Sequence, residues 1–351
     1  MTRDREHDRT TRAESLSRRK LLALGAAAGT GAGLLGALPD HVLGAGPAPR
    51  AKRIKVIFVV HDNNPFFVPV RFGFEQFGRM AGWKTQWVGP PHQSTVDTVN
   101  LQASALAARP TAVIFTRIDS SSFDANIRKA QQMGIHIILS NVASAGYKKL
   151  GVGFVGQDFI PAGQICGQQA ARYAQKLTGR TSGVIVCTNG APGNSALEER
   201  VIGMQRGVQQ YNQQHGTSYK TTVLVSSFTQ SEAIGRVDAE YTRYGSRIVG
   251  WSHAGIDHQF TAAWAAGKGL THKFAIGGFD LVPPVLADIK KGTIQWTIGQ
   301  NPYAQGFIAS ALLSMQIDPG YPAYTYDTGA EVVDASNIAA VIKRESRFGN
   351  V

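Results

Sequence analysis

The sequence predicts an α/β protein with two similar lobes, each a doubly wound parallel sheet covered by helices. From residue 51 onward, short runs rich in β-branched and aromatic residues alternate with longer runs of helical periodicity. Several short runs, such as 54–60 (IKVIFVV), are almost entirely apolar, which is typical of parallel strands buried on both faces. Ten such runs in 351 residues are too many for one domain of ordinary size.

The strands are predicted from these β-rich runs and the turn residues that bound them. They are 54–60, 84–88, 111–116, 135–140, 152–155, 183–188, 221–226, 247–251, 273–278 and 294–298. About five of them precede residue 157 and about five follow it. This division is the reason for predicting two lobes rather than one.

The helices are predicted from apolar residues at spacings of three and four. In residues 66–82, for example, Phe67, Val70, Phe74 and Phe77 form one stripe that can pack against a sheet. The other predicted helices are 94–108, 159–178, 195–214, 230–243, 256–267, 282–291 and 303–316. Strands that alternate with helices in this way form right-handed βαβ units.

Residues 1–48 are expected to be a twin-arginine signal peptide and not part of the fold. Arg18 and Arg19 precede an uncharged run of Ala, Gly and Leu from Leu21 to Leu38. A membrane anchor is the alternative, because the run approaches the minimum length of a span. Its Gly and Ala content, however, makes it only weakly hydrophobic. We therefore expect an extracytoplasmic, periplasmic-type protein that is soluble after signal cleavage.

Charge and cysteine content exclude several classes of protein. The net charge is +12, and residues 1–50 contribute 8 Lys and Arg against 5 Asp and Glu. The other basic residues are scattered, without a basic run that interleaves with aromatics, so no nucleic-acid partner is expected. Cys166 and Cys187 fall in a predicted helix and an apolar strand, which favours buried thiols over a disulfide. No CxxC, GxSxG, HExxH or P-loop motif occurs, and no cofactor or metal is expected.

Polar and aromatic residues follow several predicted strands, at the sheet edge where ligands bind in open α/β folds. The first strand is followed by HDNNPFF, which contains Asn64, Phe66 and Phe67. Amides can hydrogen-bond vicinal hydroxyls, and aromatic faces can cover the C–H face of a sugar ring. The alternative is structural, since Asn-Pro is ordinary turn chemistry and Phe67 also fits the buried stripe of its helix.

Six segments in this order resemble the ribose-binding family of periplasmic sugar-binding proteins, the type I solute receptors of ABC importers. They are NNPFF, TAVIFTRIDSSSF, GIHIILSN, VGQDFIPAGQICG, GNSALEER and AIGGFD. The resemblance covers about residues 53–316 and implies two lobes joined by a three-strand hinge. One lobe would comprise residues 51–157 and 301–328, and the other residues 158–300 and 329–351.

The resemblance also implies function and partners. The protein would be a non-enzymatic, monomeric receptor that closes by hinge bending around a monosaccharide or polyol. It would then dock on an ABC permease in the membrane, with a chemoreceptor as a second candidate partner. Residues that match the family's ligand contacts are Asn64, Phe66, Phe67, Asn141, Phe228, Asp280 and Gln300.

Two segments depart from the family's pattern. Glu198 stands where ribose binders usually carry a sugar-binding arginine, and Ser252 and His253 stand where Asn-Asp is common. We include all three as candidate ligand contacts. Exchange of an arginine fork for an acid would change the hydroxyl arrangement that the site satisfies, which implies a pentose, hexose or polyol other than ribose.

The alternatives use some of the same residues. An exported sugar hydrolase would need a carboxylate pair, for which Asp280 and Glu198 are candidates. His253, Asp257 and His258 could bind a metal, but they lack a known ligand spacing. A ligand-sensing repressor core would share the fold, but the signal peptide stands where the DNA-binding helix-turn-helix would be needed.

Overall fold

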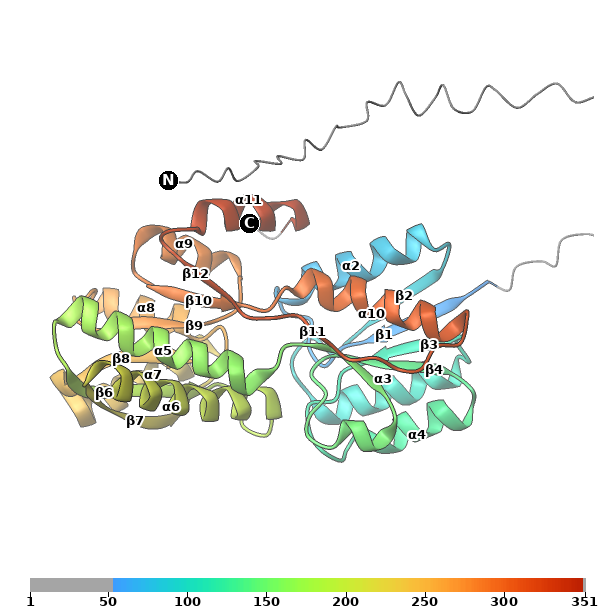
Figure 1. Ribbon diagram of the computed structural model, residues 1–351, viewed down its shortest axis with the longest axis horizontal. Coiled ribbons are helices and arrows are strands. Elements are labelled where there is room, and N and C mark those ends of the chain that lie inside the picture. The colour runs from blue at the N-terminus through green and yellow to red at the C-terminus, as the bar shows by residue number, and fades with distance from the viewer. Residues whose placement is uncertain (1–52, 350–351) are drawn as a thin grey trace, which may run out of the picture. The chain divides into compact units, whose positions relative to one another are not determined.

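The computed structural model describes residues 53–349, so the signal peptide predicted for residues 1–48 lies outside the described residues. The described chain forms two six-stranded sheets, with strand orders β11-β5-β4-β3-β1-β2 and β12-β10-β9-β8-β6-β7 (Figure 1). Strand β12 pairs antiparallel with β10, and the other neighbours pair in parallel. The predicted fold class of two α/β lobes is confirmed.

All ten predicted strands are present, with ends shifted by a few residues. The first sheet contains β1 Lys55–Val59, β2 Lys84–Val88, β3 Ala112–Phe115, β4 His136–Asn141, β5 Gly153–Gly156 and β11 Tyr326–Asp327. The second contains β6 Ser182–Asn189, β7 Ser218–Val225, β8 Ile248–His253, β9 Ala275–Phe279, β10 Trp296–Gly299 and β12 Glu331–Asp334. The short strands β11 and β12 are additions to the sequence-based prediction.

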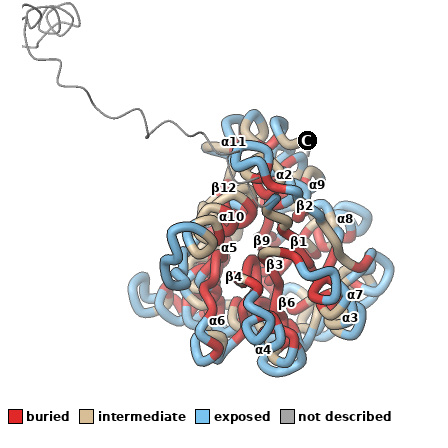
Figure 2. Tube along the Cα trace, turned by 90° about the vertical axis from the view of Figure 1, so that its right-hand side faces the viewer, coloured by how far each residue is buried: buried red, intermediate tan, exposed pale blue. Residues whose placement is uncertain are grey.

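Helices cover the faces of both sheets. They are α2 Phe67–Met80, α3 Thr95–Ala107, α4 Asp124–Gln132, α5 Phe159–Thr178, α6 Ser195–His215, α7 Gln230–Tyr244, α8 His258–Gly267, α9 Pro283–Lys291, α10 Pro302–Ile317 and α11 Ile338–Glu345. Two of these, α4 and α11, were not predicted. Buried residues follow the strands and the inner helix faces, whereas the outer helix faces are exposed (Figure 2).

Within residues 53–349 the chain passes between the two sheets three times. The connections are 156–159 from β5 to α5, 299–302 from β10 to α10, and 327–331 from β11 to β12. The late helix α10 thereby returns to the first sheet, where it packs beside α2 and on β4 (Figure 1). We keep the lobe boundaries of 51–157 with 301–328, and of 158–300 with 329–351, as a proposal.

Helices α5 and α6 pack backbone against backbone in the second lobe. Gly163 and Gly167 of α5 face Gly203 and Gly207 of α6. A Cβ atom at any of these four positions would lie 2.1–2.3 Å from a backbone oxygen of the other helix. The four glycines therefore fix the position of α6 against α5.

None of the helices in the described part of the chain combines the length and apolarity needed to cross a bilayer.

Candidate functional site

The carboxyl ends of strands from both sheets converge on one cavity of about 60 Å³ between the lobes. This is the edge at which open α/β sheets bind ligands. Seven of the ten predicted contacts line the cavity, so residues far apart in the sequence share one site. They are Asn64, Phe66, Phe67, Asn141, Phe228, Asp280 and Gln300.

Asn64 organises the first-lobe wall of the cavity. Its Oδ1 accepts a hydrogen bond of 3.0 Å from the backbone N–H of Phe66, and its Nδ2 donates one of 2.9 Å to Asp62 Oδ2. The first of these bonds is ordinary Asx-turn chemistry, as the structural alternative expected. Asn64 also lines the cavity, so the turn and the ligand-facing position are compatible. Asp62 lines it too, and burial raises the pKa of its carboxyl.

Phe66 and Phe67 form the apolar part of the same wall. Their ring centroids are 5.1 Å apart at an interplanar angle of 85°, an edge-to-face pair. Both rings are more than nine-tenths buried, and both also belong to a hydrophobic core cluster. The site is therefore built on packed side chains that hold the rings in place. His61 lies edge-on to Phe67, and burial lowers its pKa to about 3, so it is neutral.

A chain of buried amides links the lobes beneath the cavity. Asn141 Nδ2 donates to Gln305 Oε1 at 3.0 Å, and Gln305 Nε2 donates to Gln300 Oε1 at 3.1 Å. Gln300 Nε2 in turn donates to Asp280 Oδ1 at 2.5 Å. Each member is at least 91% buried, so these bonds form away from bulk water. Gln305, on the first turn of α10, was not predicted.

Asn141 and Asp280 both adopt left-handed backbone conformations, with φ of 67° and 79°. Non-glycine residues rarely do so, and such conformations cluster at functional sites. Asn141 is the last residue of β4 and Asp280 directly follows β9, and the turn of the backbone leaves both side chains lining the same cavity. Burial raises the pKa of Asp280, although Arg200 and Gln300 oppose the shift.

Arg200 is the principal site residue that the sequence-based prediction missed. Its Nη1 donates to Ala254 O at 2.9 Å, and its Cζ lies 4.0 Å from the centre of the Phe279 ring. Its Nε is buried without a partner among the described residues. Burial lowers the pKa of Arg200, and the Asp280 carboxylate opposes this shift. The cavity thus contains an arginine after all, which corrects the inference that the arginine fork is lost.

Glu198, predicted as a contact, does not line the cavity. It lies two residues before Arg200 on α6, and two residues correspond to about 200° of helix rotation. Its carboxylate instead accepts a hydrogen bond of 2.9 Å from the backbone N–H of Gly193. Both residues occur in the segment GNSALEER, so a more careful assignment of helix phase could have selected Arg200.

Ser252 and His253 are also placed away from the cavity. Strand β8 continues to His253, two residues beyond its predicted end, so both residues still belong to the sheet. Ser252 Oγ lies 3.4 Å from Cys166 Sγ on α5, and His253 Nδ1 lies 2.9 Å from Asp257 Oδ2. Gly255 and Ile256, after the strand, line the cavity in their place.

The two cysteines are free and buried, as expected, and burial raises the pKa of Cys166 to about 11. Within residues 53–349 no three His, Cys, Asp or Glu side chains are arranged to hold a metal ion. Asp257 instead pairs with His253 and with the hydroxyl of Thr188.

Phe228 supplies the aromatic wall of the second lobe. An added Cβ would lie 2.6 Å from its ring at Gly190 and 2.8 Å from it at Gly255. The ring therefore occupies space that is free only because both positions are glycines. Together with Phe66 and Phe67, it places aromatic faces on both sides of a cavity whose polar groups are two carboxylates, several amides and one guanidinium.

Comparisons with known proteins agree with this architecture. A family model for the periplasmic binding protein domain matches residues 54–321. The chain belongs to the periplasmic binding protein family. It is 22% identical over 318 residues to the xylose/arabinose-binding protein XylF of Sulfolobus acidocaldarius, covering 84% of this chain and 74% of the relative.

Solved structures show the same fold. An ABC transporter solute-binding protein from Burkholderia graminis in complex with D-arabinose matches with a TM-score of 0.73 and 22% identity, over 83% of this chain and 98% of the other. A carbohydrate transporter protein from Acidothermus cellulolyticus in complex with myo-inositol matches with a TM-score of 0.71 and 23% identity, over 84% and 99%.

Hydrogen bonds cross the mouth of the cleft in this periplasmic binding protein. Asn194 Nδ2 donates to Gln93 Oε1 at 3.0 Å, and the backbone N–H of Ser195 donates to Ile118 O at 3.0 Å. Both bonds join a first-lobe loop to the start of α6, where Asn194 is also the N-cap. The structure therefore describes a closed arrangement of the lobes. Gln93 and Asn194 line the cavity and were not among the predicted contacts.

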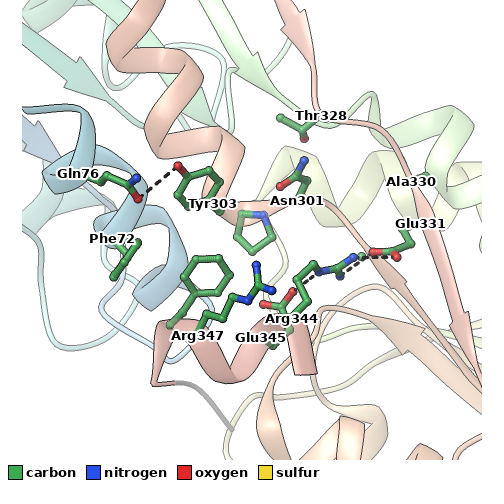
Figure 3. A pocket seen from close by; sticks show the side chains of 13 residues that line it. Phe72, Gln76, Asn301, Tyr303, Thr328, Ala330, Glu331, Arg344, Glu345 and Arg347 are labelled. Atoms are coloured by element: carbon green, nitrogen blue, oxygen red, sulfur yellow. Dashed lines mark hydrogen bonds and ion pairs between the residues drawn. The ribbon is translucent and has the colours of Figure 1, made fainter. Parts of the chain in front are cut away.

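A larger cavity, of about 830 Å³, lies beside the hinge and is lined by the middle of α2, the start of α10 and the end of the C-terminal helix α11. Three of its charged groups pair with one another, because Arg344 bonds both Glu331 and Glu345, and the hydroxyl of Tyr303 donates to Gln76 (Figure 3). We assign the ligand site of the periplasmic binding protein to the smaller cavity, where polar groups from the strand ends of both sheets converge.

Proposed function

We propose that the chain is an extracytoplasmic receptor that binds a monosaccharide or polyol between its lobes and delivers it to an ABC importer. The convergence of Asn64 and Asn141 with Arg200, Asp280 and Gln300 in one aromatic-walled cavity carries this proposal. Carboxylates and amides accept and donate hydrogen bonds to adjacent hydroxyls, and aromatic faces cover the apolar face of a sugar ring. The family of this chain consists of binding proteins rather than enzymes.

We propose a role for each group. The Asp280 carboxylate accepts hydrogen bonds from sugar hydroxyls, and the unpaired Nε of Arg200 donates to a sugar oxygen. Phe66, Phe67 and Phe228 exclude water and stack on the ring. A ligand that touches both lobes does so fully only when the lobes are closed, so its binding favours the closed state.

The named ligands of similar proteins guide the choice of sugars. The Sulfolobus relative is named for xylose and arabinose, and the two solved structures hold D-arabinose and myo-inositol. We therefore propose pentoses and cyclic polyols as the first ligands to test. A monomeric state, signal cleavage and docking on a membrane permease complete the proposal, with a chemoreceptor as the alternative partner.

An exported sugar hydrolase is the alternative function, and the geometry gives it less support. The carboxylate pair considered for hydrolysis was Asp280 with Glu198, but Glu198 does not line the cavity. Incubation with each candidate sugar, followed by mass spectrometry, separates the two hypotheses. A melting shift without any change in the mass of the sugar supports a receptor.

The decisive experiment is a melting-temperature screen of the purified protein against D-arabinose, D-xylose, D-allose and myo-inositol. At least one is expected to raise the melting temperature, through preferential binding to the folded state. Asp280→Ala is expected to abolish this rise, whereas Asp97→Ala, an exposed aspartate on α3, is expected to leave it unchanged. An unchanged shift in Asp280→Ala would reject the assigned pocket.

A further inference from the structure

Gln157 lies where the three connections between the lobes meet. It directly follows β5 on the first connection and is 1% exposed. Its Nε2 donates to Gly329 O on the third connection at 2.9 Å and, over a longer 3.4 Å, to Gly299 O on the second. One buried amide thus joins all three connections that form the hinge.

The other end of the same amide bonds a residue that lines the cavity. Gln157 Oε1 accepts a hydrogen bond of 3.0 Å from Arg200 Nη2, and Arg200 lines the cavity. A guanidinium can only donate and a backbone carbonyl can only accept, so this orientation of the amide alone satisfies every partner. A bond to a charged, buried donor is stronger than an ordinary one.

We propose that Gln157 is a positioning residue that couples the guanidinium of Arg200 to the hinge. Through Gln157, a ligand that binds Arg200 Nε also stabilises the arrangement of the three connections found in the closed protein. The side chains of the cavity wall and the hinge then favour the same conformation, which raises affinity without further ligand contacts. The ligand-dependent part of this inference rests on the proposed function, whereas the tie between hinge and arginine does not.

The first test measures the hinge without any ligand. Spin labels at two exposed helix positions, Lys129→Cys on α4 and Gln213→Cys on α6, report the distance between the lobes by pulsed electron resonance. The native cysteines are fully buried and should not be labelled. Gln157→Met is expected to broaden the distance distribution of the ligand-free protein. An unchanged distribution would overturn the proposed tie.

Gln102→Met is the matched control. Gln102 is also fully buried and donates one hydrogen bond, to Thr116 O at 2.9 Å, but it lies on α3 away from the hinge. Gln102→Met should lower the free energy of unfolding without broadening the distribution of distances between the lobes. If Gln157→Met does not fold, Gln157→Glu replaces it. Glu retains an acceptor for Arg200 but cannot donate to Gly299 and Gly329, so the distribution should broaden in this variant too.

The second test is a double-mutant cycle on the affinity for D-arabinose, or for whichever sugar in the screen binds, measured by calorimetry. Gln157→Met is expected to weaken binding by about tenfold, the effect of losing a hydrogen bond to a charged group. In an Arg200→Met background the same change should weaken binding less than about twofold. Equal effects in both backgrounds, or an unchanged affinity of Gln157→Met alone, would overturn the coupling.

The two proposals can fail separately. If the wild-type protein binds none of the sugars, the proposed function is wrong, and the distance measurement alone decides whether Gln157 holds the hinge. If the wild-type protein binds a sugar and Gln157→Met binds it equally well, the proposed function stands and the coupling is wrong.

Discussion

Gln300 donates a hydrogen bond of 2.5 Å to the carboxylate of Asp280, and both side chains are almost completely buried. This contact joins the hinge end of β10 to the carboxyl end of β9. Burial raises the pKa of Asp280, because the single amide and the nearby arginine only partly replace the water that the carboxylate loses. The protein therefore maintains a charged group at a cost, in the position where hydroxyl groups of a ligand would supply further hydrogen bonds.

Sugar binding is expected to weaken on acidification. The carboxylate of Asp280 can accept two hydroxyl hydrogens, whereas the protonated acid cannot, and its raised pKa places this change above the ordinary value of 3.8. Affinity measured by calorimetry should fall as the pH decreases through the folded pKa, which lies above 3.8. Asp62, whose pKa is also raised, would titrate in the same direction. The Asp62→Asn variant should therefore keep the part of the pH dependence that Asp280 causes. An affinity of the wild-type protein that does not change down to pH 4 would contradict the prediction.

Asp280→Asn is expected to stabilise the ligand-free protein at pH 7. Because the folded pKa is raised, the folded state binds more protons than the unfolded state between pH 3.8 and the folded pKa, so the carboxylate lowers the free energy of unfolding as pH rises through this window. Each unit of pKa difference corresponds to about 1.4 kcal/mol. Urea denaturation should show a gain at pH 7 that shrinks as the pH falls from the folded pKa towards 3.8. A less stable variant at pH 7 would show that Asp280 is net stabilising.

Arg200→Lys is expected to weaken sugar binding by about tenfold to a hundredfold, because an ammonium cannot reach Ala254 O, Gln157 and the ligand together. Arg206→Lys, an exposed position on the same helix, serves as the control and should leave affinity unchanged. Calorimetry on both proteins checks the prediction. Equal affinities of Arg200→Lys and the wild-type protein would show that Arg200 does not bind the sugar.

Gly255→Ala is expected to displace the ring of Phe228, since the new Cβ would lie 2.8 Å from it. Overpacking of this kind costs about 1–3 kcal/mol, and the displaced ring should also weaken sugar binding. Gly235→Ala on α7 has open space around the new methyl group and should stabilise the protein by about 0.5–1 kcal/mol. Thermal unfolding and a binding titration of both variants make the comparison. Unaltered binding in Gly255→Ala would mean that Phe228 does not contact the ligand.

The fold was largely predictable because the strands carry a strong local signal. Runs such as 54–60 are almost entirely apolar, and every predicted run became a strand. Helix α4 was missed because one of its few buried positions is a polar residue, Asn126. Helix α11 was missed because it has only eight residues and one of its three buried positions is a charged residue, Glu345.

The candidate site was predictable where a residue directly follows a strand, as with Asn141 and Asp280. The errors arose where a shift of one or two residues reverses the direction of a side chain. Because β8 extends two residues beyond its predicted end, Ser252 and His253 lie in the sheet and not at the cavity. On α6, the rotation of the helix places Arg200, and not Glu198, at the cavity. Gln93, Asn194 and Gln157 contribute through contacts between the lobes, which local sequence patterns do not specify.

The glycine contact between α5 and α6 limits how this receptor could acquire a new ligand. Helix α5 starts beside the hinge and α6 carries the guanidinium, and no side chain separates the two backbones. Any larger residue at Gly163, Gly167, Gly203 or Gly207 would wedge the helices apart and misdirect Arg200. Libraries for altered specificity should leave these four positions constant and diversify other residues that line the cavity.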